Sequence, residues 1–348
     1  MPAEVHPAER LKELLGREEG KLYSCAAAGV WKGGKKLFGK YVGSTESGGR
    51  RRPGAKCMFD LASITKVFTS TLIMRACGEG LLGLDSTVGG IIPAVSDRRL
   101  RKRTVAELLS HTSGLPALRN SMKRCASRSS VMRVLNGVSA GRGGAPVYSD
   151  LGFMLLGEIA EAVYGEREDE LLQKHIAGRL GLRRTTYNPP AGECFAATGL
   201  SPIRRRKLVG ETHNEVTARM DGVAGHAGIF STLDELHAFA STLLSDYSEG
   251  KGILLGRREI RNMARPVSEL FGINYGLGIM VRTTSAPGYR PSRGIAFGHT
   301  GHTGTSMWIE PGRDMVSILL TNRDEVDGSL TRMKEVRNEF HALAAAFA

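Results

Sequence analysis

The sequence is short of the features that mark secreted, membrane-spanning and fibrous proteins. Its five cysteines are an odd number without paired spacing, so free thiols in a reducing compartment are expected instead of a disulfide framework. No hydrophobic run approaches the roughly 20 residues that span a bilayer. The charged first 20 residues lack the apolar stretch of a signal peptide, and repeats and low-complexity segments are missing. We therefore expect a cytoplasmic globular protein that has no contact with a membrane.

The chain is basic overall, and part of its positive charge is clustered. The formal net charge is +13, and arginine and lysine gather at residues 50–52, 98–103 and 204–207. Such clusters can bind nucleic acid or another anionic partner. Because no aromatic residues alternate with them and no nucleic-acid-binding motif accompanies them, we interpret them as solvated faces and do not expect nucleic-acid binding.

A first motif that carries chemistry is Ser63-Ile-Thr-Lys66. A second SxxK, at residues 248–251, lies in a polar stretch with a glycine and is interpreted as a coincidence. Ser63, by contrast, opens the run ASITKVFTSTLIMRAC, in which apolar residues recur at helical spacing. The spacing predicts a largely buried helix with Ser63 in its first turn.

On such a helix, positions three apart share a face, so the Lys66 amine would reach the Ser63 hydroxyl. Burial would lower the pKa of Lys66 and allow its neutral amine to act as a base. Free N–H groups at the helix start suit a developing oxyanion. The alternative is that Ser63 only caps the helix and that Lys66 is solvated.

A second motif is Tyr148-Ser-Asp150, at the end of a Gly/Pro-rich loop. Asp150 is expected to cap the helix that follows, because apolar residues continue from it at helical spacing. Tyr148 is a candidate acid or base. The alternatives are that Tyr148 only packs and that Asp150 only caps.

A third motif is His299-Thr300-Gly301, which lies in two expected strands, 297–309 and 315–321, joined by a Pro311-Gly312 turn. Glycines in a strand often mark the close approach of a ligand or of another backbone. The alternative is a bulged strand with two exposed histidines. Zinc binding by His299 and His302 is disfavoured, because no HExxH or CxxC partner is present.

With all three motifs in this order, the chain resembles the serine β-lactamase and penicillin-binding-protein superfamily. The nearest members are class C β-lactamases and their esterase and peptidase relatives. FDLASITK resembles the nucleophile helix of that family, YSD its Tyr-x-Asn loop and HTG its Lys-Thr-Gly strand. The segments VAELLSHTSGLPA, GVAGHAGIFSTLDELHAFA and YGLGI also resemble it, so the likeness covers residues 20–325.

The resemblance implies an acyl-enzyme mechanism without a metal or cofactor. Ser63 would attack a carbonyl while Lys66 and Tyr148 share the proton, and Tyr148 would protonate the leaving group. The backbone N–H groups of Ser63 and His302 would hold the oxyanion. The remaining substrate-binding positions that the resemblance implies are Asp150, His299, Thr300 and Gly301. Which of Lys66 and Tyr148 is the base stays open.

The chain departs from the family at two positions. Asp150 replaces an asparagine, and a carboxylate cannot donate a hydrogen bond to a substrate carbonyl. His299 replaces a lysine and would give a weaker, pH-dependent positive charge. We therefore expect a serine hydrolase of a small ester or amide more than an efficient β-lactamase. The alternative is a binding protein on the same scaffold that acylates slowly or not at all and meets a ligand or an anionic partner.

Other matches to known motifs fail on context. The GxSxG at residues 137–141 is followed by RGGAPV, which does not begin a helix. The GxGxxG at 78–83 ends a helix instead of following a strand. The Gly29–Lys36 segment nearly forms a phosphate loop but has lysine where Ser or Thr must bind magnesium. His213 and His226 are interpreted as buried structural histidines, and the alternative is that they line the site.

The expected fold is α+β (α/β), of the β-lactamase/transpeptidase type. One catalytic domain, residues 1–348, would combine a sheet region (20–62 and 225–348) with a mainly helical region (63–224). The antiparallel sheet would be built from both chain ends and flanked by helices. The elements expected at the two ends are a hairpin at 22–30 and 36–42, a strand at 275–281, and helices at 7–18 and 329–346. The oligomeric state is not readable from the sequence.

Overall fold

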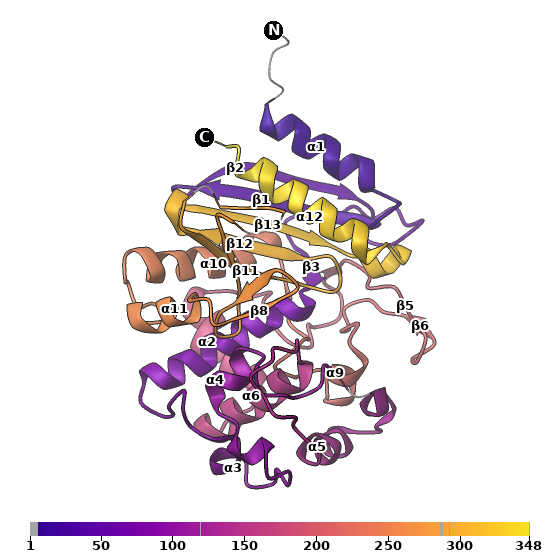
Figure 1. Ribbon diagram of the computed structural model, residues 1–348. Helices are drawn as coiled ribbons and strands as arrows, with labels where there is room; N and C mark the ends of the chain where they lie inside the picture. The colour runs from indigo at the N-terminus through magenta and orange to yellow at the C-terminus, as the bar shows by residue number, and fades with distance from the viewer. Residues whose placement is uncertain (1–5, 119, 286–287, 292, 348) are drawn as a thin grey trace.

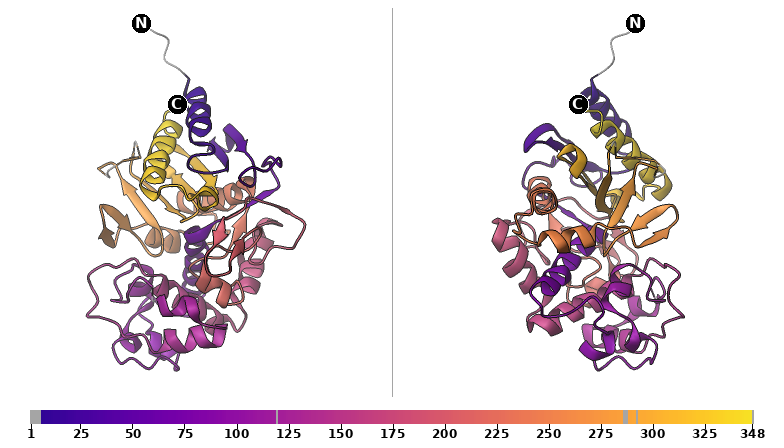
Figure 2. Two further views of the ribbon diagram at one scale, coloured as in Figure 1. Left: turned by 90° about the vertical axis from the view of Figure 1, so that its right-hand side faces the viewer. Right: turned by 60° about the vertical axis from the view of Figure 1, so that its left-hand side comes forward.

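An antiparallel sheet forms the upper part of the protein, and a mainly helical region lies below it (Figure 1). This is seen in a computed structural model that describes residues 6–118, 120–285, 288–291 and 293–347. Helices α1 (Pro7–Glu18) and α12 (Leu330–Ala344) cover the outer face of the sheet. Helix α10 (Leu233–Ser248) packs on the other face. Figure 2 shows the same layers from two further sides.

Among the described residues, eight strands form the sheet in the order β2-β1-β13-β12-β11-β10-β9-β8. Two come from the N-terminal end of the chain and six from the C-terminal end. The strands are β1 (Cys25–Lys32), β2 (Lys35–Gly43), β8 (Ser268–Leu270), β9 (Ile273–Tyr275), β10 (Met280–Thr283), β11 (Ile295–Thr300), β12 (Ser306–Glu310) and β13 (Met315–Thr321).

The two ends of the chain pair within this sheet, where β1 and β13 are its second and third strands. Strand β1 pairs with β13 in antiparallel register, from Ala26 opposite Thr321 to Lys32 opposite Met315. The expected sheet from both termini is therefore confirmed, as is the β1–β2 hairpin. Gly33 and Gly34 in its turn have φ angles of 57° and 73°, a left-handed conformation that glycine adopts without strain.

The side chains of β1 alternate between two cores, as a strand buried on both faces requires. Ala26, Ala28 and Val30 face α1 and α12, where they pack with residues such as Leu14 and Phe340. Cys25, Ala27 and Trp31 face the opposite core, which continues into the helical region. The terminal helices thus close the outer face of the sheet, and their expected positions are confirmed.

In the helical region, α2 (Thr65–Gly78) is buried on nearly all sides and packs against α6 (Asp150–Tyr164). The other helices of this region are short: α3 (Val88–Ile91), α4 (Val105–Leu109), α5 (Arg128–Asn136), α7 (Glu168–Leu172), α8 (Gly178–Leu180) and α9 (Glu215–Arg219). Helix α11 (Arg257–Met263) follows α10. Short strands also cross the region: β3 (Cys57–Asp60), β4 (Cys194–Phe195), β5 (Leu200–Ser201), β6 (Arg206–Lys207) and β7 (Phe230–Ser231).

Two expected strands are wrong because glycines turn the chain. The 297–309 strand is a hairpin, β11 and β12, in which the Gly301 N–H donates to the Thr305 carbonyl at 2.7 Å and Gly304 has a φ of +97°. The 275–281 strand is also divided, since Gly276 donates to the Ile279 carbonyl at 2.9 Å between β9 and β10. The β12–β13 connection through Pro311–Arg313 is as expected.

The expected cap of α6 is also wrong by one residue. Ser149, not Asp150, is the N-cap, because its hydroxyl accepts from the Gly152 N–H at 3.3 Å. Asp150 is the first residue inside the helix. Its carboxylate is therefore free to point away from the helix start.

Candidate active site

Ser63 follows strand β3 by three residues and lies in a single 3₁₀ turn, Ala62–Ile64, that leads into α2. The backbone just before it is strained, since Ala62 has a φ of +49°, which non-glycine residues rarely adopt. The Asp60 carboxylate accepts from the Ala62 N–H at 2.8 Å and so supports this conformation. The expected position of Ser63 at the start of a buried helix is confirmed.

Lys66 lies one turn further and is completely buried. Its Nζ lies 3.1 Å from the Ser63 Oγ, 2.7 Å from the Asp150 Oδ1 and 3.1 Å from the His226 carbonyl oxygen. An ammonium group has three N–H donors, and here each has an acceptor. Lys66 is therefore held as a cation in contact with the Ser63 hydroxyl.

The expectation that burial lowers the pKa of Lys66 is wrong. Burial does oppose its charge, but the Asp150 carboxylate and the Tyr148 hydroxyl outweigh that effect, and the pKa of Lys66 is raised. The effect is mutual. Burial would raise the pKa of Asp150, but the charge of the neighbouring Lys66 outweighs burial, and the pKa of Asp150 is lowered. The two groups form a buried ion pair, so the free amine is scarce at neutral pH.

Tyr148 faces this pair from the loop before α6. Its ring centroid lies 4.8 Å from the Lys66 Nζ, and burial raises the pKa of its hydroxyl, although Lys66 opposes that shift. Behind it lies His111, whose ring centroid is 4.7 Å away and whose Nδ1 accepts from the Ser149 N–H at 3.1 Å. Burial lowers the pKa of His111 to about 3, so it supports Tyr148 as a neutral ring. The sequence offered no signal for this role.

The HTG segment forms the end of β11, beside the nucleophile. A Cβ on Gly301 would lie 2.5 Å from the Leu61 carbonyl oxygen and 2.1 Å from the Thr305 Oγ1, so the expected close approach of another backbone is confirmed. The neighbouring Thr300 is partly exposed, and its Oγ1 lies 3.9 Å from the Met280 Sδ. Within the described part of the chain, no group accepts a hydrogen bond from the backbone N–H of His302.

His299 does not supply the positive charge that was expected of it. Its ring is buried, and its Nδ1 donates to the Thr300 carbonyl at 2.7 Å. Burial, followed by the charge of Lys66, lowers its pKa to about 3. His299 is therefore neutral at every physiological pH.

A cleft of about 360 Å³ opens in front of these groups. Four of the predicted site residues line it directly: Ser63, Tyr148, Asp150 and His302. Lys66 and His299 lie buried behind its wall. The remaining lining residues are Leu118, Lys123, His213, Asn214, Glu215 and Ala227.

The prediction that both His213 and His226 are buried structural residues is half wrong. His226 is buried, and its Nε2 lies 3.3 Å from the hydroxyl of Thr217 and from the amide oxygen of Asn214. His213 instead lines the cleft. Its family-like segment carried no spacing or motif that pointed to the site, so the sequence could not separate the two.

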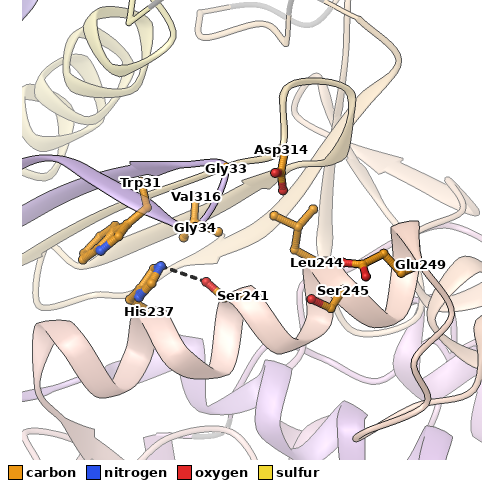
Figure 3. A pocket seen from close by; sticks show the side chains of 10 residues that line it. All are labelled: Trp31, Gly33, Gly34, His237, Ser241, Leu244, Ser245, Glu249, Asp314 and Val316. Carbon is orange, nitrogen blue, oxygen red and sulfur yellow. Dashed lines mark hydrogen bonds between the residues drawn. The ribbon is translucent and has the colours of Figure 1, made fainter.

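A second hollow, of about 250 Å³, lies between the β1–β2 turn and α10 (Figure 3). Trp31 and His237 stack there with ring centroids 3.9 Å apart, and His237 Nε2 is 2.8 Å from the Ser241 hydroxyl. None of the predicted site residues lines it. The described residues contain no group of three or more His, Cys, Asp or Glu side chains arranged to hold a metal ion.

Two further observations concern the protein as a whole. No helix in the described ranges combines the length and the apolar character that crossing a membrane requires. The five cysteines are free thiols.

The chain is similar in sequence to known proteins. The Beta-lactamase family profile matches residues 17–342. A putative D-alanyl-D-alanine carboxypeptidase of Salmonella paratyphi A (strain ATCC 9150 / SARB42) is 28% identical over 321 residues, covering 82% of this chain and 73% of the relative.

Solved structures share the fold at low identity. EstCE1, described as a hydrolase with promiscuous acyltransferase activity, has a TM-score of 0.79 at 20% identity, covering 97% of this chain and 98% of the other. A class C beta-lactamase has a TM-score of 0.79 at 18% identity, with 98% and 96% covered. With a family match over nearly its whole length, the chain belongs to the beta-lactamase family.

Proposed function

We propose that this protein is a serine hydrolase that cleaves a small ester or amide through an acyl-enzyme on Ser63. The observation that carries the proposal is the contact of the Lys66 Nζ with the Ser63 Oγ, 3.1 Å long, in a cleft that Ser63 itself lines. Relatives described as a carboxypeptidase and as an amidase support hydrolysis of a carbonyl substrate.

In the proposed reaction, the Ser63 Oγ attacks the carbonyl carbon and its proton passes to the Lys66–Tyr148 pair. Tyr148 then protonates the leaving group, and water releases the acyl group by the reverse proton movement. The backbone N–H groups of Ser63 and His302 hold the oxyanion. The free N–H of His302 supports this role.

The raised pKa values of Lys66 and Tyr148 set the pH dependence. Both groups are mostly protonated at neutral pH, and one of them must be deprotonated to accept the serine proton. We therefore propose that hydrolysis accelerates as pH rises above neutrality. A neutral His299 cannot grip the carboxylate of a penicillin, so esters and small amides are better substrates than β-lactams.

The alternative function, a binding protein that acylates slowly or not at all, is favoured by one observation. The Lys66 ammonium is saturated by three acceptors, and a saturated ammonium is a poor base. The two functions differ in turnover, so one kinetic experiment distinguishes between them.

That experiment measures the release of p-nitrophenolate from a short-chain p-nitrophenyl ester by wild type and by Ser63→Ala. We expect turnover by wild type, faster at pH 9 than at pH 7, and none by Ser63→Ala. Equal rates in both proteins would exclude Ser63 as the nucleophile. No release by either would favour the binding protein.

We further propose that the whole chain, residues 1–348, is one catalytic domain that works without a cofactor or metal in a reducing compartment. Its free thiols, of which Cys25 and Cys57 are buried, fit such a compartment. Thiol labelling of the unfolded protein, prepared without reductant, should find all five free.

A further inference from the structure

The positive charge that faces the substrate does not come from the expected residues. His299 is neutral, and the charge of Lys66, which is buried behind the cleft wall, is paired with Asp150. Among the residues that line the cleft, His213, His302 and Lys123 have side chains that can carry a positive charge, and the pKa of His302 is lowered by burial. Glu215 also lines it, but its carboxylate is paired with Arg204 at 3.3 Å.

His213 is held by a buried carboxylate. Its backbone N–H and its Nδ1 both donate to the Asp60 Oδ2 at 2.8 Å, while the Asp60 Oδ1 accepts from Ala62. The Asp60 side chain is fully buried, whereas 15% of the His213 side chain is exposed. This arrangement fixes the ring, and it fixes Nδ1 as the nitrogen that faces inward.

The other ring nitrogen of His213, Nε2, therefore faces away from Asp60. No described residue forms a hydrogen bond with it, and His213 is part of the cleft wall. A protonated imidazole donates from both nitrogens. In that state Nε2–H is a charge-assisted donor, unused by the described residues, on a side chain that lines the cleft.

The surroundings of His213 favour that protonated state. Burial opposes the charge, but the carboxylate of Asp60, and then that of Asp324, raise the pKa of His213, while Arg204 opposes them. The remaining titratable neighbours are His302, which stacks on it, and the buried His226. Burial lowers the pKa of both, so neither competes for the charge.

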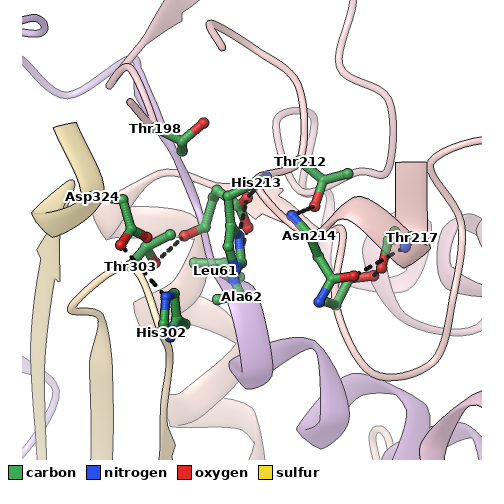
Figure 4. Close-up of polar contacts among 12 residues, drawn as sticks. Leu61, Ala62, Thr198, Thr212, His213, Asn214, Thr217, His302, Thr303 and Asp324 are labelled. Atoms are coloured by element: carbon green, nitrogen blue, oxygen red, sulfur yellow. Dashed lines mark hydrogen bonds and ion pairs between the residues drawn. The ribbon is translucent and has the colours of Figure 1, made fainter. Parts of the chain in front are cut away.

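The position of His213 indicates which part of the substrate it meets. Its ring lies parallel to that of His302, with centroids 5.4 Å apart and planes 9° apart (Figure 4), and the His302 N–H is the proposed oxyanion donor. Tyr148, the proposed donor to the leaving group, packs instead against His299 and Tyr275. The acyl substituent is thus the part directed toward His213.

We infer that His213 contacts the substrate and binds a carboxylate carried by its acyl group, so that the site takes esters or amides of an acidic acyl chain. This inference rests on the proposed hydrolysis at Ser63. His213 would donate Nε2–H to the carboxylate, and Asp60 would hold the ring in place.

The test compares two esters that differ only in the end of the acyl chain. They are p-nitrophenyl hexanoate and mono-p-nitrophenyl adipate, whose terminal carboxylate is ionised above about pH 6. The ratio of their kcat/KM values measures the selectivity for the acyl group. Changes in the protonation of Lys66 and Tyr148 affect both esters equally and therefore cancel in the ratio. We expect wild type to prefer the adipate ester by about tenfold or more at pH 6, the worth of one charge-assisted hydrogen bond.

The ratio should also depend on pH in wild type. A group with a raised pKa is charged below that value and loses its charge as pH rises through it. We therefore expect the preference to decline between pH 6 and pH 9.5. A lysine would keep its charge over this range, so a constant preference would assign the carboxylate to Lys123 and overturn the inference.

Three variants complete the test. His213→Gln keeps an N–H donor but removes the charge, and it should bring the ratio close to one. Lys123→Met should leave the pH dependence of the ratio in place. His237→Gln, in the second hollow, is the matched control and should behave as wild type does. If His213→Gln does not fold, the wild-type pH profile still decides.

The outcomes separate the inference from the function on which it rests. Hydrolysis of the hexanoate ester that depends on Ser63 but shows no preference for the adipate ester would overturn only the role of His213. The absence of hydrolysis of both esters would overturn both proposals.

Discussion

The Asp150 Oδ1 lies 2.7 Å from the Lys66 Nζ, and this pair is buried beside the nucleophile. The contact decides the charge state of the site. An asparagine at position 150 would remove the carboxylate that most strongly opposes the effect of burial on Lys66, and burial favours the neutral amine. The carboxylate instead keeps the lysine protonated.

The first prediction is that Asp150→Asn moves the acid limb of the pH–rate profile to lower pH. Removing the opposite charge should lower the pKa of Lys66 by about one to three units. The neutral amine, which can act as a base, would then form at a correspondingly lower pH. The measurement is kcat/KM for a p-nitrophenyl ester between pH 5 and pH 10.

The matched control is Asp169→Asn, which breaks an ion pair with Arg167 outside the cleft and should leave the profile unchanged. If the acid limb of the pH–rate profile lies at the same pH in Asp150→Asn as in wild type, Lys66 is not the group whose titration produces it.

The second prediction is that Tyr148→Phe keeps the fold but loses turnover. The phenyl ring retains its packing against His111, while the proton donor for the leaving group is lost. Loss of a general acid should reduce kcat by about 10²- to 10⁴-fold, with a small change in KM.

Steady-state kinetics measure this effect, with Tyr41→Phe on β2 as the control. A kcat within a factor of two of wild type would remove Tyr148 from the mechanism.

The third prediction concerns Glu168, a buried carboxyl group. Its Oε1 lies 2.7 Å from the Thr69 Oγ1, and the Thr69 Oγ1 also lies 2.9 Å from the Gly225 carbonyl oxygen. Burial raises the pKa of Glu168 to about 8. At neutral pH it is therefore a protonated acid that can donate to Thr69 while Thr69 donates to Gly225.

A carboxyl group with a raised folded pKa binds a proton that the unfolded chain releases. Between about pH 4.5 and pH 8 the free energy of unfolding of wild type should consequently lose up to about 1.4 kcal/mol per pH unit from this group. Glu168→Gln removes that contribution, so urea unfolding at pH 5 and pH 8.5 should differ less in the variant. Glu13→Gln, on an exposed position of α1, should keep the wild-type slope, and a slope shared by all three proteins would contradict the raised pKa.

The fourth prediction is that Gly301→Ala impairs catalysis. Its Cβ would lie 2.5 Å from the Leu61 carbonyl oxygen, so the segments that carry Ser63 and His302 must move apart. Displacement of an oxyanion donor should cost about 10²- to 10³-fold in kcat.

Gly16→Ala is the control, because nothing lies within 4 Å of its added Cβ. This change in an exposed helix interior should stabilise the protein by about 1 kcal/mol and leave kcat unaltered. Equal kcat values for Gly301→Ala and Gly16→Ala would show that the segments carrying Ser63 and His302 can move apart without loss of catalysis.

Much of the fold was predictable because its signals are local or periodic. The terminal helices, the β1–β2 hairpin and the buried helix of Ser63 follow from hydrophobic spacing and glycine pairs. The breaks at Gly276 and Gly301 were missed because a glycine inside a strand pattern is compatible with a bulge as well as a turn. Tertiary contacts decide between the two.

The site was predictable in its residue types but not in its charges. Spacing placed Lys66 beside Ser63, and the structure brings them together. The charge states of Lys66 and His299 depend on partners 84 residues away in the first case and on burial in the second. No sequence pattern carries that information, and the same is true of the pairing of His213 with Asp60.

The pairing of β1 with β13 has a consequence for biosynthesis. Ser63 is made early, but the HTG segment and strand β13, with which β1 pairs, are made much later. A ribosome-bound chain that ends before residue 321 carries Ser63 and Lys66 without the strand on which β1 must pair. Folding of the sheet therefore waits for contacts of very long sequence separation, and the proposed acyl transfer can begin only after residue 321 has left the ribosome.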